Sequence, residues 1–188
     1  MGAQADPPSC GDDVHLRHHD QEEALSISDQ IAIIRDGRII QSGPPRLLHE
    51  RPATRFVADF LGKSNFINGR VVAPDGDRFV YEVAGCRYVQ TIAGVPRQVG
   101  DEIVVALRPE KVEIRKGPRP EDGANGIAGE ISAWNYHGTS FHVLVETDAL
   151  GELIVTAPAW HSEVEPEVGR RVHLVWSADA AAGVVAPD

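Results

Sequence analysis

The arrangement of hydrophobic and polar residues changes in character at Gly62. Upstream of it, two apolar runs, residues 30–35 and 38–41, flank an Asp-Gly pair, and this arrangement predicts a β-hairpin. Apolar residues at helical spacing, with capping residues at the segment ends, predict short helices around the hairpin. The expected helices cover residues 20–27, 45–50 and 52–61.

Downstream of Gly62, almost every segment is a short alternating run bounded by Gly, Pro or Asp. Alternation with a period of two predicts half-buried strands, and many short strands at this spacing are typical of a sandwich or barrel. The expected strands are Asn65–Val72, Arg78–Val83, Arg87–Ile92, Glu102–Leu107, Val112–Arg115, Gly129–Trp134, Ser140–Glu146, Glu152–Thr156 and Arg171–Trp176.

A weak internal repeat runs through this second part. Residues 68–72 (NGRVV) resemble residues 128–132 (AGEIS), and residues 99–105 (VGDEIVV) resemble residues 168–174 (VGRRVHL). Two β units that start and end alike predict a pair of small OB-type barrels or one duplicated fold. Matches this short also arise between unrelated strand starts, so both interpretations remain open at this point.

Composition narrows the possible partners. The chain has 188 residues, is 42% hydrophobic and carries a formal net charge of -10. An acidic chain is a poor match for nucleic acid or for an anionic membrane surface. We find no apolar run of the roughly 20 residues that span a bilayer and no secretory signal, so direct membrane insertion is not expected. With only two cysteines, Cys10 and Cys86, no disulfide framework is implied and a reducing cytoplasm is the default.

The most informative motif begins at His19 with the residues HDQEEAL. It continues through SISDQIAIIRDGRI at residues 26–39, QSGP at residues 41–44 and RPATRFVADFLG at residues 51–62. This order resembles the H-loop of ABC ATPases together with the segments C-terminal to that loop, most closely in importers of the spermidine/putrescine, maltose and iron(III) group. The resemblance implies that residues 14–62 are a C-terminal fragment of the ATPase domain, preceded by a disordered lead-in over residues 1–13.

In that family the H-loop histidine, which is His19 here, holds the terminal phosphate and the attacking water in line. The residue before it is His18, where the family has Thr. The chain contains no G-x-x-x-x-G-K-[ST] loop, no acidic strand end for magnesium and no L-S-G-G-Q-type signature. We therefore expect His19 to be idle and the chain not to be an enzyme by itself. No cofactor is expected here, although ATP and Mg²⁺ serve the complete family.

The β-rich part resembles a TOBE domain, the OB-like regulatory extension of the same ATPases. The resemblance rests on NFINGRV at residues 65–71, LRPEKVEI at residues 107–114, GEIS at residues 129–132 and YHGTSF at residues 136–141. It implies a regulatory domain over residues 63–188. The predicted fold class is therefore mainly β: an OB-like (TOBE/MOP-type) β-barrel domain preceded by a small α+β remnant of an ABC nucleotide-binding domain.

Within that domain, Arg108, Pro109 and Glu110 form the family's R-P-E segment. They could contact a regulatory ligand. Alternatively, Arg108 and Glu110 could form a surface ion pair around a strand-ending proline, a contact that contributes under about 1 kcal/mol. The structural interpretation is favoured.

The resemblance also implies partners and a location. It implies an ABC permease and a second ATPase subunit, with a possible homodimer through the TOBE domain, at the cytoplasmic side of the inner membrane. The leading hypothesis is a truncated ATP-binding subunit whose TOBE domain serves regulation or dimerisation in transport. The alternative is a free-standing module that binds a small oxyanion or a polyamine. Nucleic-acid binding through the OB face is disfavoured by the shortage of basic and aromatic residues.

Other candidate residues carry less weight. A cluster of His15, His18, His19 and Asp20 could bind Zn²⁺ or Ni²⁺, but a fortuitous cluster is the favoured interpretation. The remaining histidines of the β-rich part are expected to be half-exposed strand residues: His137, His142, His161 and His173. The tryptophans are expected to fill barrel cores or edges: Trp134, Trp160 and Trp176. No role is assigned to Cys86.

Overall fold

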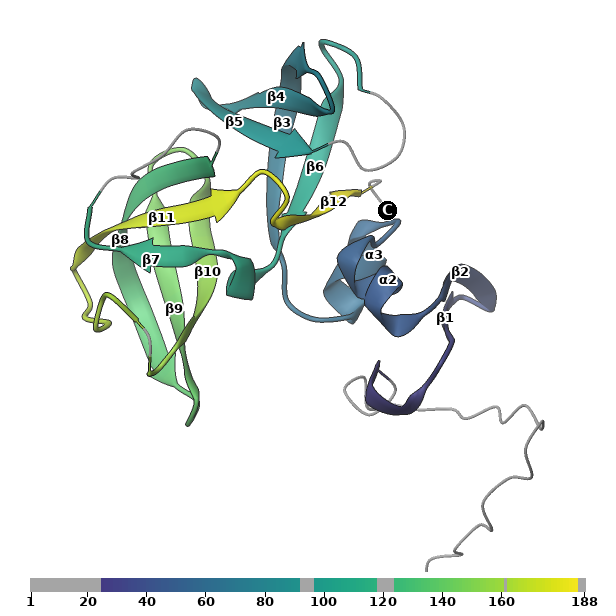
Figure 1. Cartoon of the computed structure of the whole chain (residues 1–188), viewed down its shortest axis with the longest axis horizontal. Coiled ribbons are helices and arrows are strands. Elements are labelled where there is room, and N and C mark those ends of the chain that lie inside the picture. The colour runs from purple at the N-terminus through teal and green to yellow at the C-terminus, as the bar shows by residue number, and fades with distance from the viewer. Residues whose placement is uncertain (1–24, 92–96, 118–123, 161, 186–188) are drawn as a thin grey trace, which may run out of the picture.

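The structure is a computed structural model that describes residues 25–91, 97–117, 124–160 and 162–185 (Figure 1). The described chain begins with residues 25–27 in helical conformation and continues into a small unit of two strands and two helices. This unit comprises β1 (Ile31–Arg35), β2 (Arg38–Gly43), α2 (Pro45–Glu50) and α3 (Arg55–Phe60).

The predicted hairpin is confirmed, with Asp36 and Gly37 at its tip. Both residues have positive φ, 51° and 74°, which matches the two left-handed positions of the tight turn that suits a twisted hairpin. One side of the hairpin packs with the two helices in a cluster formed by Ile33, Leu48, Val57 and Leu61. Hydrophobic burial therefore holds a two-stranded sheet that would be marginal alone.

The third predicted helix begins later than expected. We expected it from Pro52, but α3 starts at Arg55, because Thr54 is in an extended conformation and caps the helix. The Thr54 hydroxyl accepts a hydrogen bond from the Val57 N–H at 3.2 Å, which satisfies one of the helix's unpaired donors.

The β-rich part forms two five-stranded antiparallel sheets with the same plan. Their strand orders are β5-β4-β3-β6-β12 and β10-β9-β8-β11-β7. The strand bounds are β3 (Asn65–Asp75), β4 (Arg78–Val83), β5 (Cys86–Thr91), β6 (Glu102–Leu107), β7 (Glu113–Arg115), β8 (Ala124–Tyr136), β9 (Ser140–Thr147), β10 (Gly151–Pro158), β11 (Arg171–Ser177) and β12 (Ala181–Val185). The mainly β, OB-like class is confirmed, although β12 was not predicted.

The duplication suggested by the sequence is present in atomic detail. In the first sheet, Val71 donates its N–H to the Asp101 carbonyl and accepts from the Gly100 N–H. In the second sheet, Ile131 makes the same pair of bonds with the Arg170 carbonyl and the Gly169 N–H. The repeated glycines preceding these residues are equivalent as well, because a Cβ on Gly129 would meet Val145 Cγ1 at 2.6 Å and one on Gly69 would meet Tyr81 Cδ2 at 2.7 Å.

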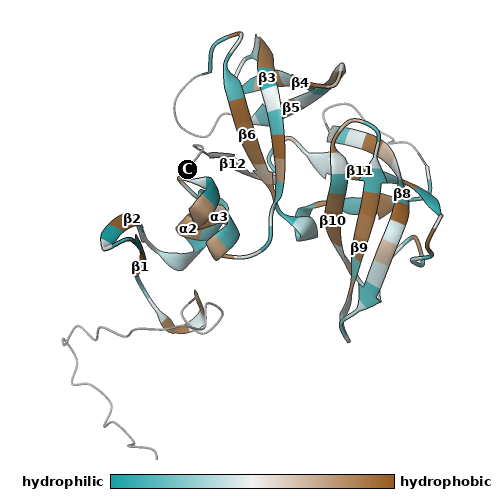
Figure 2. Cartoon of the chain, turned by 180° about the vertical axis from the view of Figure 1, so that it is seen from behind, coloured by the Kyte–Doolittle hydropathy of each residue, from teal (hydrophilic) through white to brown (hydrophobic). Residues whose placement is uncertain are grey.

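The two sheets exchange their last strands. β7 follows β6 in sequence but pairs with β11, and β12 follows β11 but pairs with β6. The first crossing passes through the short 3₁₀ helix η1 (Pro109–Lys111), and Figure 1 shows β7 beside β11 and β12 beside β6. A single hydrophobic cluster runs through both sheets, and Figure 2 shows brown bands of hydrophobic residues along β3, β6, β9 and β11, which contribute to it. The β-rich part is therefore one interlocked body.

The tryptophans separate into different environments. Trp176 is 2% exposed and lies in the core, as expected. Trp134 is 40% exposed at an end of the second sheet, whereas Trp160 is 74% exposed, so the expectation that it fills a core is wrong. Trp160 follows β10 in a turn. Among the described helices, none is long and apolar enough to cross a membrane.

Candidate functional site

The junction between the helical unit and the two sheets is organised around Arg108. This residue follows β6 directly and stands at the N-terminal cap of η1, with Pro109 as the first helical residue. Proline favours that position because its fixed φ suits a helix start. The backbone therefore leaves the sheet and turns at Arg108, which directs its side chain toward α2 and α3.

The Arg108 side chain is 2% exposed and binds backbone oxygens at the C-terminal ends of both helices. Nη1 donates to Ala58 O at 2.9 Å, Gly62 O at 2.8 Å, Lys63 O at 3.3 Å and Ser64 Oγ at 2.9 Å, and Nη2 donates to His49 O at 3.3 Å. The last carbonyls of a helix have no partner within the helix and carry partial negative charge. A cation placed there stabilises both helix ends and joins them to β6.

This geometry corrects one expectation for the R-P-E segment. Arg108 is buried rather than on the surface, and no ion pair within the described ranges joins it to Glu110, which is exposed. Burial lowers the pKa of Arg108, and the carboxylates of Glu110 and Asp59 oppose that shift from a distance. Arg108 therefore acts as a junction residue whose acceptors are carbonyls, and Pro109 is buried beside it.

His49 lies at the same junction. Partial burial lowers its pKa, and the positive charge of Arg108 lowers it further, whereas Glu110 and Glu50 act in the opposite direction. The neutral imidazole is therefore favoured near the Arg108 guanidinium.

Two buried asparagines join the sheets to each other. Asn65 Nδ2 donates to Ile154 O at 2.8 Å, and its Oδ1 accepts from Ile154 N at 2.7 Å. Asn125 makes the equivalent pair with Val89, at 2.9 and 2.6 Å. Each asparagine thus hydrogen-bonds a backbone N–H and C=O at the outer edge of the other sheet, since β10 and β5 are edge strands.

The sequence analysis missed both asparagines. A usable signal was present, because each lies four residues before a repeated glycine, in N-x-x-x-G at residues 65–69 and 125–129.

An exposed aromatic group lies at the β8–β9 turn. Phe141 contacts Trp134 and Tyr136, with ring centroids 5.7 and 5.5 Å apart, and His137 stacks on His142 at 4.1 Å. Burial lowers the pKa of His142, and the neighbouring His137 and Lys63 lower it further. The two histidines are therefore a stacked surface pair.

Several predicted residues lie outside the described part: His19 and its neighbours His15, His18 and Asp20, together with Cys10 and His161. Within the residues that the structure does describe, no three His, Cys, Asp or Glu side chains are grouped so that they could hold a metal ion. Cys86 is exposed and is a free cysteine among the residues that the structure describes.

Comparisons with known proteins agree with this architecture. The TOBE domain family matches residues 105–183. The spermidine/putrescine import ATP-binding protein PotA of Rubrobacter xylanophilus is 36% identical over 85% of this chain and 42% of its own length. PotA of Methylococcus capsulatus is 37% identical over 85% of this chain and 41% of its own length.

One solved structure shares the fold. The cytoplasmic molybdate-binding protein ModG, with molybdate bound, matches 62% of this chain and 92% of its own with a TM-score of 0.56 at 14% identity. At this identity the likeness concerns the fold alone. The chain spans about two fifths of the length of the curated relatives. It belongs with the ATP-binding subunits of ABC importers, as the C-terminal region that carries their TOBE domain.

Proposed function

We propose that this chain is the regulatory C-terminal module of a polyamine importer's ATP-binding subunit, and that it does not hydrolyse ATP by itself. The observation that carries the proposal is the 36% identity to a spermidine/putrescine import ATP-binding protein across 85% of the chain. The match includes both the helical unit and the sheets, which Arg108 joins.

The junction supports a mechanical role. Movements of a helical unit reach a second domain only if the contact between them is stiff. Here one buried guanidinium binds two helix ends and Ser64 at once, so α2 and α3 are held to β6. The chain would thus transmit or limit movement between the ATP-binding part of an importer and its TOBE domain.

The proposed partners derive from the same assignment. In the proposed assembly, an importer permease and a second ATP-binding subunit contact this chain, and TOBE domains of two subunits meet. The location would be the cytoplasmic side of the inner membrane, peripheral to the permease. The transported substrate would be a polyamine, as in the names of the relatives.

The absence of independent catalysis is proposed from the sequence. A triphosphate needs a backbone cradle, a lysine and a held Mg²⁺ before a histidine can position the attacking water. The 188 residues contain no G-x-x-x-x-G-K-[ST] loop. The test is phosphate release by the purified full chain with Mg-ATP, together with nucleotide binding by calorimetry. We expect neither signal above buffer, and turnover by a preparation free of other ATPases would refute this part.

The alternative, an oxyanion- or polyamine-binding module, is tested separately. Its motive is the shared fold with a molybdate-binding protein, and that likeness extends to the fold alone. A thermal-shift screen of molybdate, sulfate, phosphate, putrescine and spermidine distinguishes the two. A saturable rise in the melting temperature with one of them would favour the alternative.

A further inference from the structure

Four buried polar side-chain atoms in the core beside the first sheet have no hydrogen-bond partner among the residues that the structure describes. They are Tyr81 Oη, Tyr88 Oη, Gln90 Oε1 and Trp176 Nε1. Burial raises the pKa of Tyr88, and the nearby Cys86 thiol raises it further without meeting the hydrogen-bond geometry. All four residues are between 0% and 2% exposed. Buried polar groups left unpaired cost about 1–3 kcal/mol each, so such a concentration requires an explanation.

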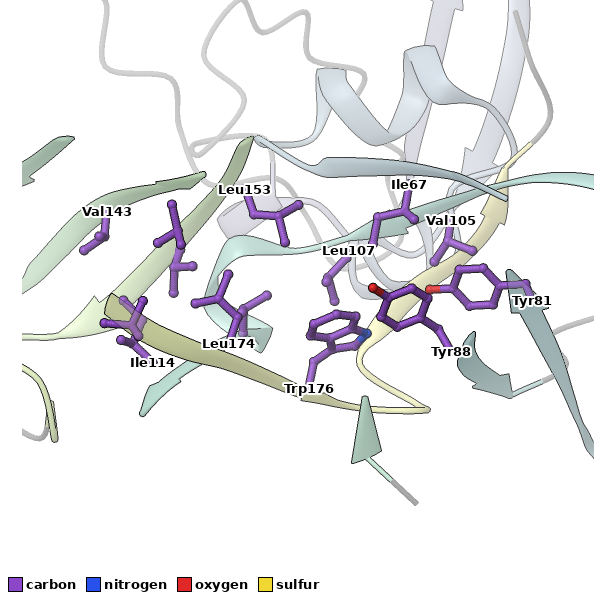
Figure 3. Packing of buried hydrophobic residues seen from close by; sticks show 14 of the residues in the cluster. Ile67, Tyr81, Tyr88, Val105, Leu107, Ile114, Val143, Leu153, Leu174 and Trp176 are labelled. Carbon is purple, nitrogen blue, oxygen red and sulfur yellow. The ribbon is translucent and has the colours of Figure 1, made fainter. Parts of the chain in front are cut away.

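The side chains are adjacent in space. Tyr81 and Tyr88 are direct cross-strand partners with ring centroids 5.6 Å apart, and Tyr88 stacks on Trp176, also at 5.6 Å. Gln90 lies two residues beyond Tyr88, on the same face of β5. In Figure 3 the Tyr81 hydroxyl points toward Tyr88, the Tyr88 hydroxyl points toward Trp176, and the indole nitrogen faces Tyr88.

The duplicated fold provides an internal comparison. When the two repeats are superposed so that Val71 matches Ile131, the strand registers match each of the four residues above with one residue of the other repeat. The equivalents of Tyr81, Tyr88, Gln90 and Trp176 are Val145, Leu153, Val155 and Leu107. Every one of these is aliphatic and at most 2% exposed.

The comparison shows that the fold does not require polar groups at these positions. One half fills them with aliphatic side chains, and the other fills them with two phenols, an amide and an indole. The difference is concentrated in one layer, where Trp176 of the second sheet meets Tyr88 of the first.

We propose that this layer is a sealed hydration site, in which at least one ordered water bridges Tyr81, Tyr88 and Trp176. Water suits the chemistry, because it can accept from the indole N–H and from one phenol and donate to the other phenol or to the Gln90 oxygen. Burial this deep excludes larger solutes from ready exchange. A buried water makes about three hydrogen bonds to groups that lack other partners.

The test compares Tyr81→Phe and Tyr88→Phe with Tyr136→Phe, which removes an exposed hydroxyl that donates to the Gly138 carbonyl at the surface. If water satisfies the buried hydroxyls, each buried variant loses a hydrogen bond and melts about 2–4 °C below the parent. The control should melt within about 1 °C of it. If the hydroxyls are unpaired, removing them is neutral or stabilising, and an unchanged or higher melting temperature overturns the proposal.

A second readout detects the water itself. Magnetic relaxation dispersion of water deuterons reports internal waters that exchange slowly with solvent. The amplitude should fall in the Tyr81→Phe/Tyr88→Phe double variant relative to both the parent and Tyr136→Phe. An amplitude that the double variant leaves unchanged overturns the proposal, whatever the melting temperatures are.

Discussion

Replacing Arg108 with Met tests the junction, because it removes the guanidinium and keeps an apolar stem of similar length. The two N–H groups of Nη1 are shared among four oxygen acceptors, and Nη2 donates to a fifth. Removing one partner of a buried charged interaction costs about 3–5 kcal/mol. We expect the lower end, about 3 kcal/mol, since the groups left behind are neutral oxygens at helix ends rather than a stranded carboxylate.

That loss corresponds to a fall of about 6–12 °C in Tm for a chain of this size. Urea unfolding followed by circular dichroism measures the stability of the whole chain. Hydrogen exchange shows where the loss lies, and protection should fall first in α3 and at Gly62, before the sheets. Arg108→Lys should be intermediate, because lysine keeps the charge but cannot bind several carbonyls with a planar fork.

The matched control is Arg70→Met, which removes an arginine from an exposed ion pair with Glu102 at 3.3 Å. Exposed pairs contribute about 0–1 kcal/mol, so this variant should remain close to the parent. The junction role would be refuted if Arg108→Met and Arg70→Met were equally stable. It would also be refuted if Arg108→Met lowered hydrogen-exchange protection in both sheets as much as in α3.

Three further predictions concern other parts of the fold. Burial and Arg108 lower the folded-state pKa of His49, so its stabilising contribution is present above about pH 6.5 and is lost as pH falls through that lower folded-state pKa. His49→Gln should therefore flatten the profile of Tm against pH between about pH 7 and 5. Asn125→Leu should lower the free energy of unfolding by about 2–3 kcal/mol in urea titrations, since it leaves the edge at Val89 unpaired, and a loss below 0.5 kcal/mol would contradict the edge-capping role. Gly129→Ala should cost about 1–3 kcal/mol because its Cβ would overlap Val145, whereas Gly117→Ala meets nothing within 4 Å and should be nearly neutral in the same titrations.

The helices, strands and turns were predictable from the sequence where residues close together in the chain determine them. Asp36-Gly37 fixed the hairpin, and alternation fixed most strands of the β-rich part. β12 was missed because residues 181–185, AAGVV, contain small residues and no polar alternation. It is a strand because β6 offers an unpaired edge, which is a long-range cause that periodicity does not contain.

The exchange of β7 and β12 and the burial of Arg108 could not be predicted either, because both depend on contacts between residues far apart in the sequence. A charged residue beside a proline is usually exposed, and only the proximity of two helix ends makes this guanidinium a core group. The repeat, in contrast, was visible in the glycines, since Gly69 and Gly129 each lie where a Cβ would collide with the neighbouring strand. The role of His19 stays a prediction, because that residue lies outside the described ranges.

The central claim is that this chain serves as the C-terminal module of a polyamine importer subunit. The most direct test replaces the aligned C-terminal region of the Rubrobacter xylanophilus relative with the matching residues of this chain and measures ATP-dependent uptake of labelled spermidine with the cognate permease. We predict uptake well above that of the relative lacking its C-terminal region, and a marked reduction when the chimera carries Arg108→Met. A chimera that assembles and hydrolyses ATP but takes up no more spermidine than the truncated relative would contradict the account.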